Sequence, residues 1–325
     1  MIRVQKLLGC LALAAATVTG ANAQTYPTKP IYLYIPFAAG GPTDTLGRNL
    51  AQVMGKPLKQ QLIVENVVGA GGTIAVARAA KAAPDGYTVL LHHIGMSTAP
   101  SLYRTLTFDP LKDFEYIGEV ADVPMTLIGG EKFPPNNFKE LVAYIKQNKD
   151  KVTYANAGLG AASHLCGLLF MTAIQADVTT VPYKGTGPAM NDLLGGQVDF
   201  MCDQTTNTTG QILGGKVKTY GVTSKKRVPS LPKIPTLDEQ GLKGFEVVVW
   251  HGLYVPKGTP KPVVERLTAA LQEAVKDPGF KDNLAKLGAE PVAPNRATPQ
   301  ALQQLLSSEI AKWGPIIKKA GQYAD

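Results

Sequence analysis

Two loops of small residues occupy the same kind of position in the two halves of the chain. The first, residues 37–44, follows an apolar segment at 31–36 and precedes a helical pattern of apolar residues. The second, residues 156–163, follows an apolar segment at 152–155 and also precedes a helical pattern. Repetition of strand, loop and helix predicts a mainly parallel sheet covered by helices. Ligands of such sheets bind beyond the carboxyl ends of the strands, where both loops lie.

The same alternation continues through each half. Further strands are expected at residues 62–67, 87–91, 178–183 and 198–202, and helices at 72–80, from Pro188 to Gly195–Gly196, 262–275 and 299–318. Two long apolar extended segments, 116–128 and 245–254, can carry the chain between two domains. The predicted organisation is a first domain of residues 24–121 plus 250–325, and a second domain of residues 122–249.

The first 23 residues read as a secretory signal peptide. Arg3 and Lys6 precede an apolar stretch at 7–18, and Ala21-Asn22-Ala23 is a small-x-small cleavage pattern. We therefore expect cleavage after Ala23 and a periplasmic protein. Leu7 to Cys10 imitates a lipoprotein box, but only two apolar residues precede its glycine, so lipidation is disfavoured and left open. No later run reaches the roughly 18 apolar residues that span a bilayer.

Composition excludes several classes of function. The formal charge of +8 falls to +6 once Arg3 and Lys6 leave, and the remaining cations are scattered along the chain. This distribution suits small anions better than a nucleic acid, which needs basic residues on one face. Four histidines without carboxylates at ligand spacing predict neither a metal site nor a cofactor. Cys166 and Cys202 either form a bridge or stay as two buried thiols, and we favour the thiols.

The glycine-rich helix entrances are the best candidates for a binding site. The start of a helix leaves backbone N–H groups unpaired and carries partial positive charge, and glycine lets an anion approach closely. Neither loop contains arginine, and Lys184 is the nearest cation. Thr43, Thr45 and Ser163 could add hydroxyl donors, whereas Asp44 is expected to cap its helix and orient the loop. The alternative is that these glycines only make tight turns, and residues 69–73 leave the same two possibilities open.

The histidines offer a second polar contact. His92 and His93 follow a predicted strand, where neighbouring side chains point to opposite faces, so at most one should face the ligand. His164 is expected to pack at a helix start, and His251 beside Trp250 lies in a predicted crossover. No nucleophile elbow, zinc helix or cysteine–histidine pair is found, so the sequence does not predict an enzyme.

Taken in order, the motifs of the chain resemble the Bug family of periplasmic solute receptors, the binding components of tripartite tricarboxylate transporters. The resemblance covers essentially the whole mature chain. It is carried by Tyr26-Pro27 with Lys29-Pro30, residues 36–44, 69–72, 84–87, 154–165, 182–185 and 196–200, Lys226-Arg227, Pro235-Thr236 and residues 252–256.

This resemblance implies an α/β Venus flytrap of the type II periplasmic-binding-protein class, with two domains, a hinge and a ligand in the cleft between them. In such receptors the two loop backbones, with ordered waters, hold one carboxylate. Where many relatives have serines, Ala161 and Ala162 stand here, so backbone groups must carry more of the binding. The ligand-binding residues expected on this basis are Phe37, Ala39, Gly40, Gly41, Thr43, Asp44, His93, Asn156, Gly158, Gly160, Ala161, Ser163 and Asp203.

The function expected from the resemblance is capture of an organic dicarboxylate and its delivery to a membrane permease, by a monomer without catalytic activity. Because Phe37, Tyr154, Tyr183 and Trp250 could lie near the cleft, an aromatic acid such as terephthalate is slightly preferred over a C4 to C6 aliphatic acid. One alternative keeps the binding fold but makes the protein a periplasmic sensor subunit for a two-component signalling kinase. A periplasmic enzyme, which would turn its ligand over, is the remaining hypothesis.

Overall fold

The computed structural model describes residues 26–321 and residue 323. The predicted signal peptide, its cleavage site and Cys10 lie outside this part of the chain. Within it, no helix is both long enough and apolar enough to cross a membrane.

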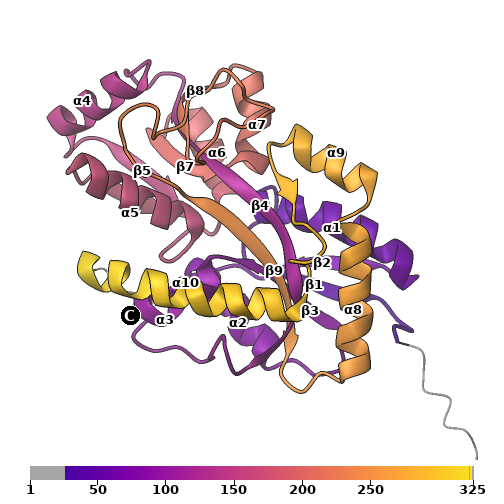
Figure 1. Ribbon diagram of the computed structural model, residues 1–325. Helices are drawn as coiled ribbons and strands as arrows, with labels where there is room; N and C mark the ends of the chain where they lie inside the picture. The colour runs from indigo at the N-terminus through magenta and orange to yellow at the C-terminus, as the bar shows by residue number, and fades with distance from the viewer. Residues whose placement is uncertain (1–25, 322, 324–325) are drawn as a thin grey trace, which may run out of the picture.

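The first half of the chain forms a parallel sheet with helices on both faces (Figure 1). Along β1, Ile31, Leu33 and Ile35 pack on one face, while Tyr34 packs on the other, because neighbouring strand residues point in opposite directions. The elements are β1 (Ile31–Ile35), α1 (Pro42–Leu58), β2 (Leu62–Asn66), η1 (Ala70–Gly72), α2 (Thr73–Ala80), β3 (Thr88–His93) and α3 (Gly95–Leu102).

The second half repeats this arrangement. Its strand β5 pairs in parallel with β6 and β7, and helices pack on both sides. Tyr154 of β5 joins the core under α5, whereas Ala155 joins the core under α6. The elements are α4 (Phe138–Asn148), β5 (Thr153–Asn156), α5 (Ala162–Ile174), β6 (Thr179–Pro182), α6 (Thr186–Gly195), β7 (Phe200–Gln204), α7 (Thr205–Leu213) and β8 (Val217–Val222).

Two long antiparallel strands join the halves. β4 (Phe114–Gly130) and β9 (Val248–Pro256) pair along their length and run from one half into the other (Figure 1). β9 also pairs with β3 of the first half, and β4 with β7 and β8 of the second. The whole sheet therefore has the strand order β2-β1-β3-β9-β4-β7-β5-β6, with β8 and β10 (Glu290–Pro291) pairing β4 off this path.

The C-terminal segment folds back on the first half. It contains α8 (Lys261–Ala274), α9 (Pro278–Lys286) and α10 (Pro299–Ala320). Leu267 and Leu271 of α8 pack against the core beneath α1, while Leu302 and Leu306 of α10 join the core of the opposite face. The two predicted C-terminal helices are therefore present, whereas α9 is not anticipated from the sequence.

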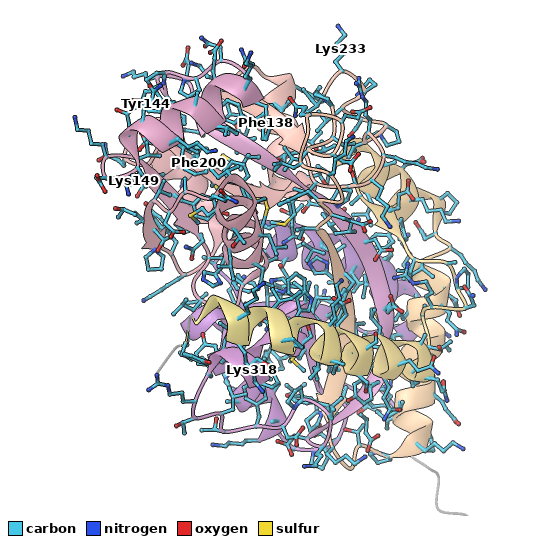
Figure 2. The ribbon with its side chains drawn as sticks, turned by 60° about the vertical axis from the view of Figure 1, so that its left-hand side comes forward. Phe138, Tyr144, Lys149, Phe200, Lys233 and Lys318 are labelled. Carbon is cyan, nitrogen blue, oxygen red and sulfur yellow. A yellow bond between two sulfur atoms is a disulfide. The ribbon has the colours of Figure 1, made fainter. Side chains whose placement is uncertain are left out.

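The core of the second half contains a disulfide that the sequence analysis did not favour. Cys166 of α5 and Cys202 of β7 are bonded, with their Cα atoms 6.1 Å apart. The preference for free thiols was wrong because 36 residues separate the two cysteines in the chain, and only the packing of α5 on β7 brings them together. Phe200 of β7 and Phe138 of α4 belong to the same apolar core (Figure 2), and each packs against Phe170 of α5.

Candidate functional site

Four helix N-termini meet at one buried cavity between the two halves. The helices are α1 from the first half and α5, α6 and α7 from the second. The cavity is lined by Phe37, Pro42, Thr43, His93, Ala157, Ala161, Ala162, Ser163, Thr186, Asp203 and Gln204. Each of the four helices is preceded by a strand whose carboxyl end points at the cavity, which is where sheets of this kind bind ligands.

None of these four helices is capped by a side chain. The N-cap residues are Gly41 for α1, Ala161 for α5, Gly185 for α6 and Gln204 for α7, and none makes a side-chain capping hydrogen bond. The first N–H groups of each helix therefore stay available to a bound group. Together with the partial positive charge of four helix starts, they can hold an anion.

The cavity is small and contains few ionisable groups. Its volume is about 10 Å³, room for about one water molecule, so the two halves lie close together. Among its lining residues, only His93 and Asp203 have ionisable side chains, and none is lysine or arginine. Burial holds the pKa of His93 well below its usual range, so its ring is neutral. Burial raises the pKa of Asp203 to about 6.

The first loop is braced by the carboxylate of Asp44. Its Oδ2 accepts from the Gly40 amide at 3.0 Å and from Arg48 Nε at 2.9 Å. Its Oδ1 accepts from Asn66 Nδ2 at 2.9 Å, and the same amide donates to Phe37 O. Burial alone would raise the pKa of Asp44, but these hydrogen bonds bring it below the usual value. Asp44 thus orients the loop, while Arg48 acts outside the cavity.

The second loop is shaped by its own polar residues. Asn156 Oδ1 accepts from the Gly158 amide at 2.8 Å, which turns the backbone back toward α5. Ser163 Oγ accepts from the Ala157 amide at 2.9 Å, so its proton remains available for a bound acceptor. Gly158 has a φ of +98°, a conformation that favours glycine.

The loops of the two halves contact each other directly around the cavity. The Ala38 amide donates to Lys184 O at 2.9 Å, and Thr98 Oγ1 donates to Gly160 O at 3.0 Å. Tyr103 Oη lies 2.7 Å from Ala70 O in the first half and 3.1 Å from Leu159 O in the second. The structure is therefore a closed form of the cleft.

Glycine is required at the mouth of this cleft. A Cβ atom placed on Gly71 would lie 1.8 Å from Leu159 O. Sequence analysis left open whether residues 69–73 line the binding site or only make a tight turn, and the structure matches neither possibility fully. The segment does not line the cavity, yet it turns the chain and meets the opposing loop at the cavity's mouth.

The histidines form a cluster behind the cavity. The ring of His93 stacks on Phe37 with centroids 4.8 Å apart, and His93 lines the cavity. His92 does not line it, but the two rings lie 4.9 Å apart rather than on separate faces. The hydrogen bonds His93 N to His92 Nδ1 and Gly95 N to His93 Nδ1 bend the end of β3 and draw the rings together. His251 lies opposite His93 in the sheet.

Sequence reasoning found part of the cavity lining. Of the residues expected to bind ligand, the lining includes Phe37, Thr43, His93, Ala161, Ser163 and Asp203. The others shape the two loops and do not line the cavity: Ala39, Gly40, Gly41, Asp44, Asn156, Gly158 and Gly160. Pro42, Ala157 and Ala162 lie within the two predicted loops but were not singled out as ligand-binding residues, whereas Thr186 and Gln204 lie outside the predicted site. A helix start directly after a strand, at Thr186 and Gln204, was the available signal.

Three of the four aromatic rings expected near the ligand are elsewhere. Tyr154 is buried in the core of the second half, where its hydroxyl donates to Ser163 O. Tyr183 donates to Asp192 Oδ2, and Trp250 lies against Glu309 of α10. Of these four rings only Phe37 lines the cavity: β5 and β9 direct Tyr154 and Trp250 into the core, and Tyr183, which follows β6, turns toward α6.

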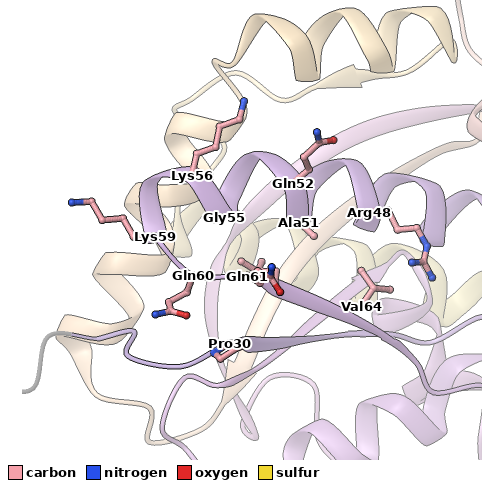
Figure 3. Close-up of a pocket in the computed structure, with 11 residues that line it drawn as sticks. Pro30, Arg48, Ala51, Gln52, Gly55, Lys56, Lys59, Gln60, Gln61 and Val64 are labelled. Atoms are coloured by element: carbon pink, nitrogen blue, oxygen red, sulfur yellow. The ribbon is translucent and has the colours of Figure 1, made fainter.

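A larger hollow lies on the outer side of the first half. It is about 840 Å³, lies between α1 and β2, and includes Lys56, Lys59 and Gln61 among its lining residues (Figure 3). Lys56 and Lys59 are exposed and extend toward solvent. A site that surrounds and desolvates its ligand is better matched by the buried cavity between the halves than by this open surface.

Comparison with known proteins relates the chain to a family of transport receptors. The family model described as "Tripartite tricarboxylate transporter family receptor" matches residues 46–322. A UPF0065 protein from the TAR-I ttuE–ttuC′ intergenic region of Agrobacterium vitis is 49% identical over 298 residues, covering 92% of this chain and 86% of that protein.

Two solved structures are also similar. The periplasmic binding protein BugD is 55% identical, with a TM-score of 0.90 over 92% of this chain and 100% of that chain. MatC of Rhodopseudomonas palustris, solved with bound malate, is 39% identical, with a TM-score of 0.87 over 90% of this chain and 100% of that chain. The expected two-domain α/β binding-protein fold is therefore confirmed.

Proposed function

Because the chain belongs to the tripartite tricarboxylate transporter receptor family, a family of binding proteins rather than enzymes, we propose that it captures an organic dicarboxylate in the periplasm and delivers it to a membrane permease. One observation carries the proposal. Four uncapped helix N-termini surround a buried cavity whose lining holds no lysine or arginine. Backbone N–H groups can neutralise a carboxylate in such a place without a cationic side chain.

The proposed binding cycle uses the two loops in sequence. In an open form, one carboxylate is held by the free N–H groups of α1 or α5. Closure then adds the opposing loop and removes water, which strengthens each hydrogen bond to the anion. The contacts Ala38 N to Lys184 O and Thr98 Oγ1 to Gly160 O are of the kind that hold the closed form. Opening reverses them and releases the ligand to the permease.

The hinge of this cycle is proposed to lie in β4 and β9. These strands pair Ala121 with His251 and Asp122 with Trp250, at the predicted division between residues 24–121 plus 250–325 and residues 122–249. The register of the pair shifts near Ala121, and an irregular ladder bends more readily than a regular one. We propose that the two halves rotate about this point.

The ligand is proposed to be a dicarboxylate, and two classes compete. Terephthalate, the aromatic candidate, is now supported by one ring only, Phe37 stacked on His93. Relatives solved with malate, at 39% identity, and with adipate, at 32% identity, favour a C4 to C6 aliphatic acid. We therefore place the aliphatic acids first and keep terephthalate as their competitor.

Calorimetry of the mature protein against succinate, malate, adipate, terephthalate and their dimethyl esters tests the proposal. One-site binding of at least one acid is expected, with the ester weaker by about tenfold or more, because the ester removes the charge that the helix N-termini hold. Equal affinity for acid and ester would reject the anion site. Gly41→Val should weaken binding while leaving a cooperative thermal melt, since its Cβ would lie 3.3 Å from Ala38 O and 3.4 Å from Gly187 N and would crowd the contact between the first loop and α6.

A further inference from the structure

One wall of the cavity carries two side chains with buried acceptor oxygens. Asp203 and Gln204 stand at the end of β7, exposed by only 1% and 3% respectively, and both line the cavity. A carboxylate placed there faces the same space as the anion-binding helix starts. Two negative charges in one site repel each other, so a carboxylate in an anion site is unfavourable unless it makes a favourable contact with another part of the ligand.

The known partners of Asp203 do not use all of its acceptor capacity. Its Oδ1 accepts from Thr186 Oγ1 at 2.8 Å, its Oδ2 accepts from Asn207 Nδ2 at 2.6 Å, and the backbone N–H of Gln204 donates a third hydrogen bond to the carboxylate. A carboxylate offers about four acceptor positions. Among the described residues, no lysine or arginine forms an ion pair with Asp203, although a buried carboxylate normally has a cationic partner or a full set of donors.

Gln204 gives a second, independent sign. Its Oε1 is buried and has no hydrogen-bond partner among the described residues. Buried polar atoms are nearly always paired, so an unpaired acceptor at the wall of a ligand cavity points to a donor on the ligand. Thr43 Oγ1, across the cavity in α1, is unpaired in the same way and can serve either as donor or as acceptor.

We infer that Asp203 and Gln204 select acids that carry a hydrogen-bond donor, a hydroxyl or an ammonium group, on the carbon beside the carboxylate. The inference rests on the proposed function, because the helix N-termini must first hold the carboxylate. Asp203 stands just before α7 and accepts from Thr186 at the start of α6, so a donor that reaches Asp203 lies close to a carboxylate held by these helix starts. A site built to accept from such a donor discriminates against the analogue that lacks it, because its buried acceptors are then left unpaired.

The test compares matched acids of one chain length by calorimetry at pH 7.5. The probes are succinate, malate and aspartate, with glutarate, 2-hydroxyglutarate and glutamate as the five-carbon set. The wild type should bind at least one donor-bearing acid about tenfold or more tightly than the plain acid. Asp203→Asn should reduce this preference to about threefold or less, through a loss of affinity for the donor-bearing acid.

Two further variants keep the result interpretable. Asp192→Asn removes a half-buried carboxylate of α6 that does not line the cavity, and it should keep the wild-type preference. Gln204→Met keeps the length of the side chain, removes the unpaired acceptor and should lower the preference even if Asp203→Asn fails to fold. An unchanged preference in both Asp203→Asn and Gln204→Met would overturn the inference.

Other outcomes separate this inference from the proposed function. If the plain acids bind as tightly as their donor-bearing analogues in the wild type, the selection by Asp203 is refuted while the carboxylate site stands. If no acid of either set binds and esters bind equally, the proposed function fails and the inference falls with it. Uptake of nearly one proton on binding, measured in two buffers, would mean that Asp203 is protonated and donates, which also overturns the inference.

Discussion

Replacement of Gly71 by alanine should separate cleft closure from folding. An alanine Cβ at this position would lie 1.8 Å from the backbone oxygen Leu159 O, whereas Cβ contacts below 3.0 Å essentially do not occur. The two loops would have to part by about 1.2 Å, the difference between these distances. Residues 71 and 159 belong to loops of opposite halves, which meet only in the closed cleft. The clash between the Cβ atom and Leu159 O therefore raises the free energy of the closed form and leaves that of the open form unchanged.

The size of the effect follows from the contacts that would be lost. Parting the loops weakens the hydrogen bonds from Tyr103 Oη to Leu159 O and from Ala38 N to Lys184 O. Each contributes about 1 kcal/mol net, so closure loses about 2 kcal/mol and the dissociation constant rises about 30-fold. The left-handed φ of +59° adds about 1 kcal/mol of strain for alanine, equally in the open and closed forms.

Gly215→Ala is the matched control. Gly215 has a φ of +65°, and nothing lies within 4 Å of a Cβ placed there. Both variants should therefore lose similar thermal stability, but only Gly71→Ala should lose affinity in calorimetry. Small-angle scattering with saturating ligand should also show a larger radius for Gly71→Ala. Wild-type affinity in that variant would refute the argument that Gly71 permits closure.

Three further predictions concern the histidines and the disulfide. His93→Phe should lower the preference for dicarboxylates over monocarboxylates by about tenfold in calorimetry, through loss of one buried donor, and an unchanged ranking would make His93 a packing residue. Burial lowers the pKa of His251 to about 3, so its contribution to stability is full above pH 6.5 and is lost as the pH falls toward 3. Urea unfolding of His251→Phe at pH 7 and pH 5 should show a shallower loss than the wild type, by up to about 1.4 kcal/mol per pH unit, and equal slopes would contradict this sign. Replacing Cys166 and Cys202 by alanine should remove about 4 kcal/mol of stability and lower the melting temperature by about 8–16 °C, and an unchanged melt would count against a native bridge.

The alternation of strands and helices was predictable because its signal is local. Leu46, Leu50, Val53 and Met54 lie on one face of a helix by spacing alone, and all four are buried in α1. The two segments that cross between the domains were also predictable, since long apolar extended segments such as 116–128 and 245–254 are typical of strands shared between two domains. β4 and β9 are those strands.

The part of the site that depends on packing was not predictable. Gln204 reaches the cavity because β7 pairs antiparallel with β4, with Gln204 opposite Met125, and no local pattern records that register. The disulfide and the positions of Tyr154 and Trp250 depend in the same way on contacts between distant segments. What the sequence does carry is the small-residue character of the loops, which a close backbone approach requires.

The hydroxyl of Tyr103 affects the energy barrier for opening of the cleft. It has one proton and two carbonyl acceptors, Ala70 O beneath it and Leu159 O on the opposing half. When the cleft opens, the hydroxyl can keep its hydrogen bond to Ala70 O, while Leu159 O becomes exposed and accepts a hydrogen bond from water. At this contact the opening leaves no polar group unpaired, so breaking it adds little to the barrier for opening.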